Sequence, residues 1–226
     1  MCFSATASFG SGMLLSAIGV ASLRKVRTGN RRLFAAIPLL FGVQQFSEGF
    51  VWLGLQDSSY GWIVPVCAAV FSFCAHTLWP TVVPLSIMLM EPQAERRKVL
   101  QWTLAVGVLT SLYFLVCQLS FPGTAMIDGY HIRYVHGYPM EFATTVGIFY
   151  MVSTIIPHFV SSLRRASLFG ITTAIAYGIT YVLYNDYIVS VWCFFSALLS
   201  AIVYYILYPA PTHILSGEHN ARHHHA

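Results

Sequence analysis

The chain has 226 residues, of which 57% are hydrophobic and only 9% are charged, and its formal net charge is +4. A soluble domain carries roughly 25% charged residues. This composition therefore excludes the soluble, disordered, collagen-like and nucleic-acid-binding classes. It predicts an all-α polytopic membrane protein whose main partner is the lipid bilayer.

Seven apolar segments are long enough to cross a bilayer, since about 20 helical residues span the hydrocarbon core. The third contains Pro65, Pro80 and Pro84, which predict a kink or an early end. The sequence thus predicts a single seven-helix transmembrane domain over residues 1–208 and a polar cytoplasmic tail over 209–226. The predicted spans are residues 4–23, 33–55, 62–90, 99–121, 143–163, 166–184 and 188–207.

The placement of Lys and Arg predicts the orientation of the bundle. Eleven of the twelve lie in the loops after the first, third and fifth segments or in the tail, all on one side. Only Arg133 lies on the other side. We therefore expect a multi-pass protein of the inner (cytoplasmic) membrane, with the N-terminus outside and the C-terminus in the cytoplasm.

The outer connection over residues 122–142 predicts a small β-hairpin. Asp128-Gly129 separates two short runs, 124–127 and 130–135. Asp-Gly between two such runs is a strong signal for a two-residue hairpin turn. We expect the hairpin to lie over the outer mouth of the bundle.

Short words recur between the first three and the last three segments. The first segment ends Val20-Ala-Ser-Leu-Arg-Lys25, and the fifth ends Val160-Ser-Ser-Leu-Arg-Arg165. Transporter folds often arise by duplication. The matches are compatible with a repeat of three helices on either side of a linking fourth helix, although short apolar words also recur by chance.

The opening Met1-Cys-Phe-Ser-Ala-Thr-Ala-Ser-Phe9 resembles the start of an uncharacterised bacterial family of seven-span membrane proteins. This resemblance implies the architecture and no particular activity. The three-plus-one-plus-three plan is also similar to that of sugar-efflux semi-transporters and microbial rhodopsins. Rhodopsin function is excluded, because the chain's two lysines, Lys25 and Lys98, lie in predicted cytoplasmic loops and no retinal Schiff base can form.

Seven-span zinc hydrolases are a further comparison. Gln44 and Glu48 resemble part of their acidic second-span motif, but the last segment lacks the paired histidines of that group. The resemblance therefore gives little support to zinc hydrolysis.

Ionisable side chains inside the segments are costly in a membrane, so each is a candidate functional residue. They are Glu48, His76 and His158. Gln44 and Gln45 precede Glu48 by four and three residues, so all three share one helix face. No Lys or Arg lies within a segment, and the Glu48 carboxyl should therefore be protonated or face water. Counting helical rise from the outer ends, we expect the two histidines at a similar depth.

Three functions remain open. We favour an outward-opening polar pocket that binds a small molecule, for binding, sensing or transport, through Gln44, Gln45, Glu48, His76 and His158. The second is an intramembrane metal-dependent enzyme or a metal- or haem-binding protein. In it His76 and His158 hold zinc, copper or haem, and Glu48 is the catalytic base. The third is a structural subunit of a membrane complex, in which these side chains join helices.

Cys2 is a further candidate metal ligand, since removal of Met1 would expose both its amine and its thiol. The closing His223-His224-His225 run is read as a solvated tail rather than a metal site. The sequence identifies neither the small molecule nor the oligomeric state.

Overall fold

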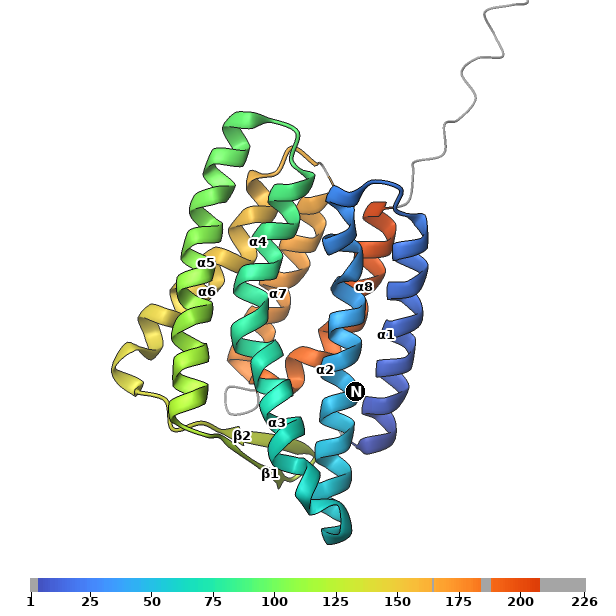
Figure 1. Cartoon of the computed structure of the whole chain (residues 1–226), viewed down its shortest axis with the longest axis vertical. Coiled ribbons are helices and arrows are strands. Elements are labelled where there is room, and N and C mark those ends of the chain that lie inside the picture. Colours follow the sequence, from blue (N-terminus) through green and yellow to red (C-terminus); the bar gives the residue numbers. More distant parts are fainter. Residues whose placement is uncertain (1–3, 164, 184–187, 208–226) are drawn as a thin grey trace, which may run out of the picture.

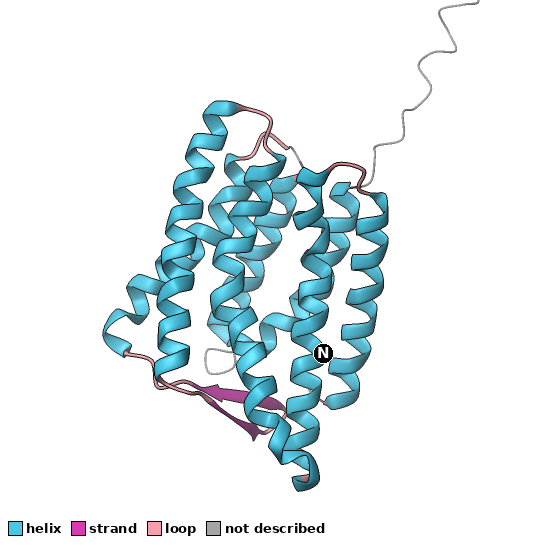
Figure 2. Ribbon diagram, in the orientation of Figure 1, coloured by secondary structure: helices cyan, strands magenta, loops and turns pink. Residues whose placement is uncertain are grey.

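The computed structural model describes residues 4–163, 165–183 and 188–207, which form seven helical rods and one small sheet (Figures 1 and 2). Each apolar segment predicted above is helical, with ends that differ by a few residues. The third rod is continuous and contains two α-helices. The helices are α1 (Ala5–Lys25), α2 (Arg32–Gln56), α3 (Val64–Ser72), α4 (Trp79–Met90), α5 (Ala94–Ser120), α6 (Ala143–Val160), α7 (Ala166–Leu183) and α8 (Ile188–Leu207).

The apolar helices are consistent with a multi-pass integral membrane protein. Within the described residues, α7 and α8 contribute shorter apolar stretches, Ala166–Thr180 and Phe195–Leu207. Large side chains such as Leu109 and Leu119 are exposed on the outside of the bundle, where lipid tails would surround them. In the part of the chain that the structure describes, five helices are long and apolar enough to cross a membrane: Ala5–Lys25, Gly29–Gln56, Ser58–Met90, Ala94–Ser120 and Ala143–Val160.

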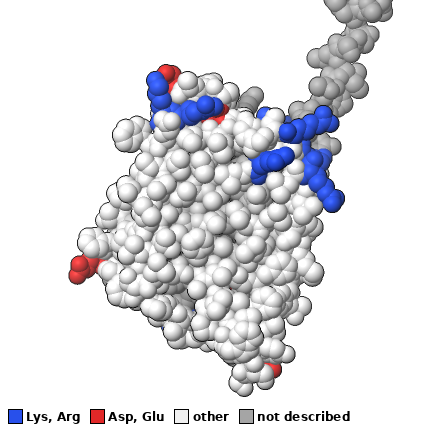
Figure 3. Space-filling view, in the orientation of Figure 1, with Lys and Arg blue, Asp and Glu red and all other residues white. Residues whose placement is uncertain are grey.

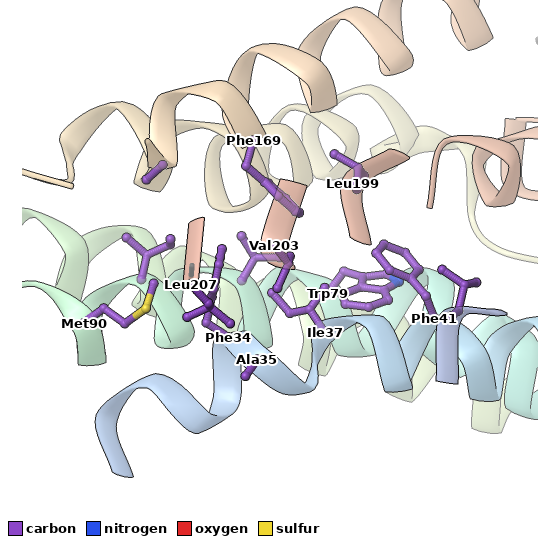
Figure 4. Close-up of a cluster of buried hydrophobic side chains, with 14 of the residues drawn as sticks. Phe34, Ala35, Ile37, Phe41, Trp79, Met90, Phe169, Leu199, Val203 and Leu207 are labelled. Atoms are coloured by element: carbon purple, nitrogen blue, oxygen red, sulfur yellow. The ribbon is translucent and has the colours of Figure 1, made fainter. Parts of the chain in front are cut away.

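The main core lies between α2, α4, α7 and α8. Phe41 of α2 packs on Trp79 of α4 with ring centroids 4.2 Å apart. Phe34 meets Phe169 of α7 at 6.0 Å, and Leu199 of α8 closes the cluster (Figure 4). Side chains from distant parts of the sequence therefore fill the centre of the bundle.

The third rod changes its helical geometry where the sequence predicts a kink. A π-helical turn, Phe73–Leu78, joins α3 to α4 without a break. Pro65 lies in the first turn of α3, where a missing N–H costs nothing. Pro80 instead follows the π turn directly, so it cannot donate an N–H to the carbonyls of that turn. The hydroxyl of Tyr150 in α6 donates to the carbonyl of Ala75 in the π turn at 2.8 Å. A side chain of a neighbouring helix thus supplies a hydrogen bond to a carbonyl of the π turn.

The carbonyl of Pro80 lies where α4 packs closely on α5. Pro84 has no N–H to donate to this carbonyl four residues earlier. Gly107 of α5 packs directly against it, and a Cβ at Gly107 would collide with the Pro80 oxygen and approach Ser153 of α6 to 3.2 Å. Only glycine fits where these three helices meet.

We predict that Gly107→Ala destabilises the bundle by about 2 kcal/mol or more, because backbone must move to admit one methyl group. Thermal unfolding of the purified protein in detergent measures the loss. Gly147→Ala in α6 is the control. A Cβ there meets no atom within 4 Å, so alanine should be neutral or stabilise by roughly 0.5–1 kcal/mol. Equal behaviour of the two variants would contradict the packing argument.

The predicted hairpin is confirmed as β1 (Thr124–Asp128) and β2 (His131–Val135), paired antiparallel with Asp128 opposite His131. The two turn residues are Gly129 and Tyr130, so the turn lies one residue later than Asp-Gly. Gly129 has φ +61°, as the favoured hairpin turns require at their first position. Ile132 is buried in a small cluster with Val51, Trp52 and Ala68, which fixes the hairpin to the end of the bundle.

Basic side chains gather at the end of the bundle opposite the hairpin, around the α1–α2 and α4–α5 connections (Figures 1 and 3). This agrees with the pattern of loops read from the sequence. Arg133 lies in the hairpin and pairs with Asp128. The predicted tail over 209–226 lies outside the described residues.

Candidate functional site

Glu48 lies in the interior of α2, with its side chain completely buried. Nε2 of Gln45 donates to Oε2 of Glu48 at 3.4 Å. Oγ of Ser11 in α1 in turn donates to Oε1 of Gln45 at 2.7 Å. Gln45 and Glu48 therefore meet, as the three-residue spacing predicts, and they join α1 to α2.

Gln44 points to a different helix. Its Oε1 accepts a hydrogen bond from Nε1 of Trp79 in α4 at 3.2 Å. One end of α2 also packs on α3 through Trp52 and Ala68. Because α2 and the third rod run antiparallel, these contacts bring Glu48 to about the depth of the π turn.

His76 lies in the π turn and contacts a second histidine that the sequence analysis did not single out. The His76 and His136 rings meet edge to face, with centroids 5.0 Å apart. Nδ1 of His76 is 3.2 Å from the carbonyl oxygen of Ser72, and Nε2 of His136 is 2.9 Å from the Ser72 hydroxyl. Tyr138 and Phe114 complete the cluster. Ser72 thus holds both histidines.

His136 and Tyr138 come from the segment between β2 and α6. Burial lowers the pKa of His136 below its ordinary value, so the ring is neutral at pH 7 and has one donor and one acceptor nitrogen. Burial raises the pKa of Tyr138 to about 12. The His136 and Tyr138 side chains are therefore uncharged near neutral pH.

A pocket of about 120 Å³ lies between α3, the end of α5 and the hairpin, and we call it the hairpin pocket. Gln118 of α5 donates from Nε2 to the carbonyl of Ala69 at 2.7 Å. Its Oε1 is buried and has no hydrogen-bond partner in the described part of the chain. The pocket is lined by Pro65, Ala68, Ala69, Ser72, Gln118, Pro122, Gly123, Thr124, Tyr134 and His136.

His158 lies in the last turn of α6, away from His76. Its ring is 1% exposed and stacks on Phe169 of α7 at 4.8 Å. Among the described residues, neither ring nitrogen has a hydrogen-bond partner. Ser162 contacts Glu91, so the adjoining ends of α6 and α4 lie at one level. His158 is about 6 Å from that level and His76 about 22 Å, from a rise of 1.5 Å per residue.

The two histidines therefore do not share a depth, and they contact different groups. The described ranges contain no group of three or more His, Cys, Asp or Glu side chains that could hold a metal ion. Cys2 lies outside those ranges. The hypothesis of a bis-histidine metal or haem centre gains no support from this geometry.

Glu91 is a second buried carboxylate, and sequence reasoning missed it because it follows the third segment as an ordinary loop residue. Oε1 accepts from Oγ of Ser162 at 2.6 Å and from the Gln93 N–H at 3.1 Å. Oε2 accepts from Oγ of Ser161 at 3.0 Å and from the Ser162 N–H at 2.7 Å. The guanidinium of Arg97 also donates to the Glu91 carbonyl at 2.7 Å. Glu91 thus ties the α4–α5 turn to the end of α6.

These contacts determine the pKa of Glu91. Burial acts to raise it, but the hydrogen bonds from Ser162, Gln93 and Ser161 together outweigh burial, and the net shift is downward. A lowered pKa in the folded state means that the stabilisation is fully present above the unfolded pKa. It is lost as the pH falls through the folded value.

We predict that Glu91→Gln costs about 1–3 kcal/mol at pH 7, because Gln replaces one accepting oxygen with a donor and leaves serine hydroxyls unpaired. Thermal unfolding from pH 7 to pH 3 should show the wild type losing its advantage over the variant below about pH 4.3, the ordinary glutamate value.

Glu95→Gln is the matched control for this prediction. Glu95 has a side chain 84% exposed and forms a surface pair with Lys98, so its substitution should change stability by less than about 1 kcal/mol. A cost at Glu91 no larger than at Glu95, or one independent of pH, would refute the role assigned to Glu91.

Comparison with known proteins identifies a family without an assigned activity. A model of the family of unknown function DUF6629 matches residues 1–213, so the chain belongs to that family. No curated protein and no solved structure matches the chain.

Proposed function

We propose that this member of the family crosses the inner (cytoplasmic) membrane seven times, with the N-terminus outside and the C-terminus in the cytoplasm. Support comes from the packing of α7 and α8 among the longer apolar helices, since α8 contacts α1 and α2 and α7 contacts α6. The basic loops lie at the end opposite the hairpin. The positive-inside rule assigns that end to the cytoplasm and the hairpin to the outside.

Labelling with a membrane-impermeant thiol reagent tests this orientation in intact cells whose native cysteines have been replaced. We expect Ser59→Cys, in the turn after α2, to be labelled from outside. Asn30→Cys, in the α1–α2 connection, should react only after the membrane is opened. Labelling of Asn30→Cys in intact cells would reverse the topology.

We further propose that the protein binds a small uncharged polar molecule in the hairpin pocket, for sensing or transport. The observation that carries this proposal is the set of polar groups in its wall: Ser72 bonded to His136, and the unpartnered Oε1 of Gln118. Buried polar atoms without partners are rare in folded proteins. A ligand that donates to Gln118 would supply the missing partner.

The lining also limits the chemistry of the ligand. The described residues around the pocket include no Asp, Glu, Lys or Arg, so a charged ligand would lose its hydration without a counter-ion. The pocket volume of about 120 Å³ is somewhat below the roughly 150 Å³ cavity that holds benzene in another protein. Amides, ureas and alcohols of about six heavy atoms or fewer fit both limits.

Glu48 has a separate role in this proposal. It does not line the hairpin pocket but lies at about the depth of the π turn, with Gln45 as a hydrogen-bond partner. If the ligand is transported, Glu48 is the group we propose to carry a proton with it. We propose that a ligand moving inward from the hairpin pocket would contact four further side chains, which do not line the pocket itself: Gln44, Gln45, His76 and His158.

Titration of the purified full-length protein with acetamide, urea and propanol, followed by thermal unfolding, tests pocket binding. At least one compound should raise the unfolding temperature, and Ser72→Ala should abolish the increase because it removes the hydroxyl beside His136.

Ser86→Ala is the control for this experiment. Ser86 is equally buried in the same rod but bonds only to the Val83 carbonyl of its own helix in the described structure. It should therefore keep the response. No response from any compound, or an unchanged response in Ser72→Ala, would reject the pocket as the binding site.

A further inference from the structure

A large groove at the basic end of the bundle has no part in the function proposed above. It has a volume of about 690 Å³ and lies between the α1–α2 connection and the end of α8. Arg24, Lys25, Arg27 and Arg31 line it, and the described lining contains no acidic residue. We call it the basic groove.

The arginines of this groove differ from Arg96 and Arg165 at the same end. Arg96 donates to the carbonyl of Val160, and Arg165 donates to the carbonyl of Tyr205. Those two guanidinium groups therefore form hydrogen bonds with the protein's own backbone. In contrast, the side chains of Arg24, Arg27 and Arg31 form no hydrogen bond or ion pair with any described residue.

The floor of the groove is apolar. Ile206 and Leu207 of α8 line it together with Val26, and all three belong to or pack against the main core cluster. The Lys25 ammonium lies 5.1 Å from the centre of the Tyr204 ring, and this cation–π contact positions it at the edge of the groove. The groove is thus lined by basic side chains on its sides and by apolar side chains at its base.

This combination fits a ligand that carries both a phosphate and hydrocarbon. Arginine guanidinium groups bind phosphate oxygens through paired hydrogen bonds, and the ends of α1 and α8 are where lipid headgroups lie if both helices span. Basic pockets between transmembrane helices bind anionic headgroups in this way. We propose that the basic groove binds the phosphate of an anionic phospholipid, with an acyl chain against Ile206 and Leu207.

The groove, rather than the general positive charge of this end, is responsible for binding. A pair of exposed basic residues outside the groove makes this distinction testable. Arg32 begins α2, and Lys98 lies in the first turns of α5 with a side chain 68% exposed. Neither lines the groove. Their replacement by Gln removes the same two charges as replacement of Arg27 and Arg31.

The test uses the full-length protein in neutral detergent, titrated with short-chain phosphatidylglycerol, with phosphatidylcholine of the same chain length, or with inorganic phosphate. Native mass spectrometry counts bound molecules, and thermal unfolding follows stabilisation. We expect phosphatidylglycerol to bind and stabilise. The Arg27→Gln/Arg31→Gln variant should bind it about 30-fold more weakly, as expected for two lost charges near an anionic headgroup.

The Arg32→Gln/Lys98→Gln variant should lose less than about threefold. Equal losses in the two variants would show diffuse attraction and reject the groove. Equal stabilisation by phosphatidylcholine would reject recognition of the anionic headgroup. Stabilisation by inorganic phosphate that matches phosphatidylglycerol would reject the lipid and its acyl chain as the ligand. All four substituted side chains are exposed, so unfolding without lipid should be unchanged and provides the folding check.

Discussion

The backbone of the third rod, where regular hydrogen bonding is interrupted, constrains the packing of its neighbours. Inside hydrocarbon no water compensates a carbonyl that lacks its helical partner. The π turn presents the Ala75 carbonyl, and Tyr150 of α6 donates to it. The Pro80 carbonyl, which Pro84 cannot pair, lies directly against Gly107 of α5, where a side chain would collide with it. Two neighbouring helices are therefore positioned by groups that an ideal helix would have satisfied internally.

The same irregular turn connects the fold to the proposed site. The π turn Phe73–Leu78 accompanies the hydrogen bond of Ser72 and the ring contact of His76 with His136. His136 reaches the rod because Ile132 anchors the hairpin on Val51 and Trp52. A ligand in the hairpin pocket would thus touch both the hairpin and the third rod next to the π turn, on which α5 and α6 pack. Ligand binding at the hairpin, as proposed above, would therefore act directly on the packing of the helices.

Local patterns in the sequence predict much of this fold, because each pattern acts within a short stretch of chain. Apolar length identifies the helices, and the turn at Gly129 identifies the hairpin. Such local patterns do not predict the hydrogen bond between His136 and Ser72, which are 64 positions apart. They also do not predict the four hydrogen bonds to the Glu91 carboxylate. Equal depth for His76 and His158 was expected from rise alone. This prediction is wrong because the relative depth of two rods depends on their tertiary contacts. Here Glu91, which follows α4, is hydrogen-bonded to the residues that follow α6.

Between the hairpin pocket and the basic groove, the described core contains a small cavity among α2, α4, α6, α7 and α8. The cavity beside Phe41, Trp79, Phe169 and Leu199 has a volume of only about 30 Å³, room for one or two water molecules. A ligand of six heavy atoms does not fit this cavity, so passage through it would require α4 to separate from α7 and α8. Gln45 can donate to Glu48 whether that carboxyl is ionised or carries a proton on its other oxygen. A change in the protonation of Glu48 can thus accompany such a movement without breaking the hydrogen bonds that join α1 and α2.

Sensing needs no separation of the core helices, only a change at the π turn when a ligand occupies the hairpin pocket. For the ligand proposed above, sensing therefore requires less movement of the described core than transport through this cavity does.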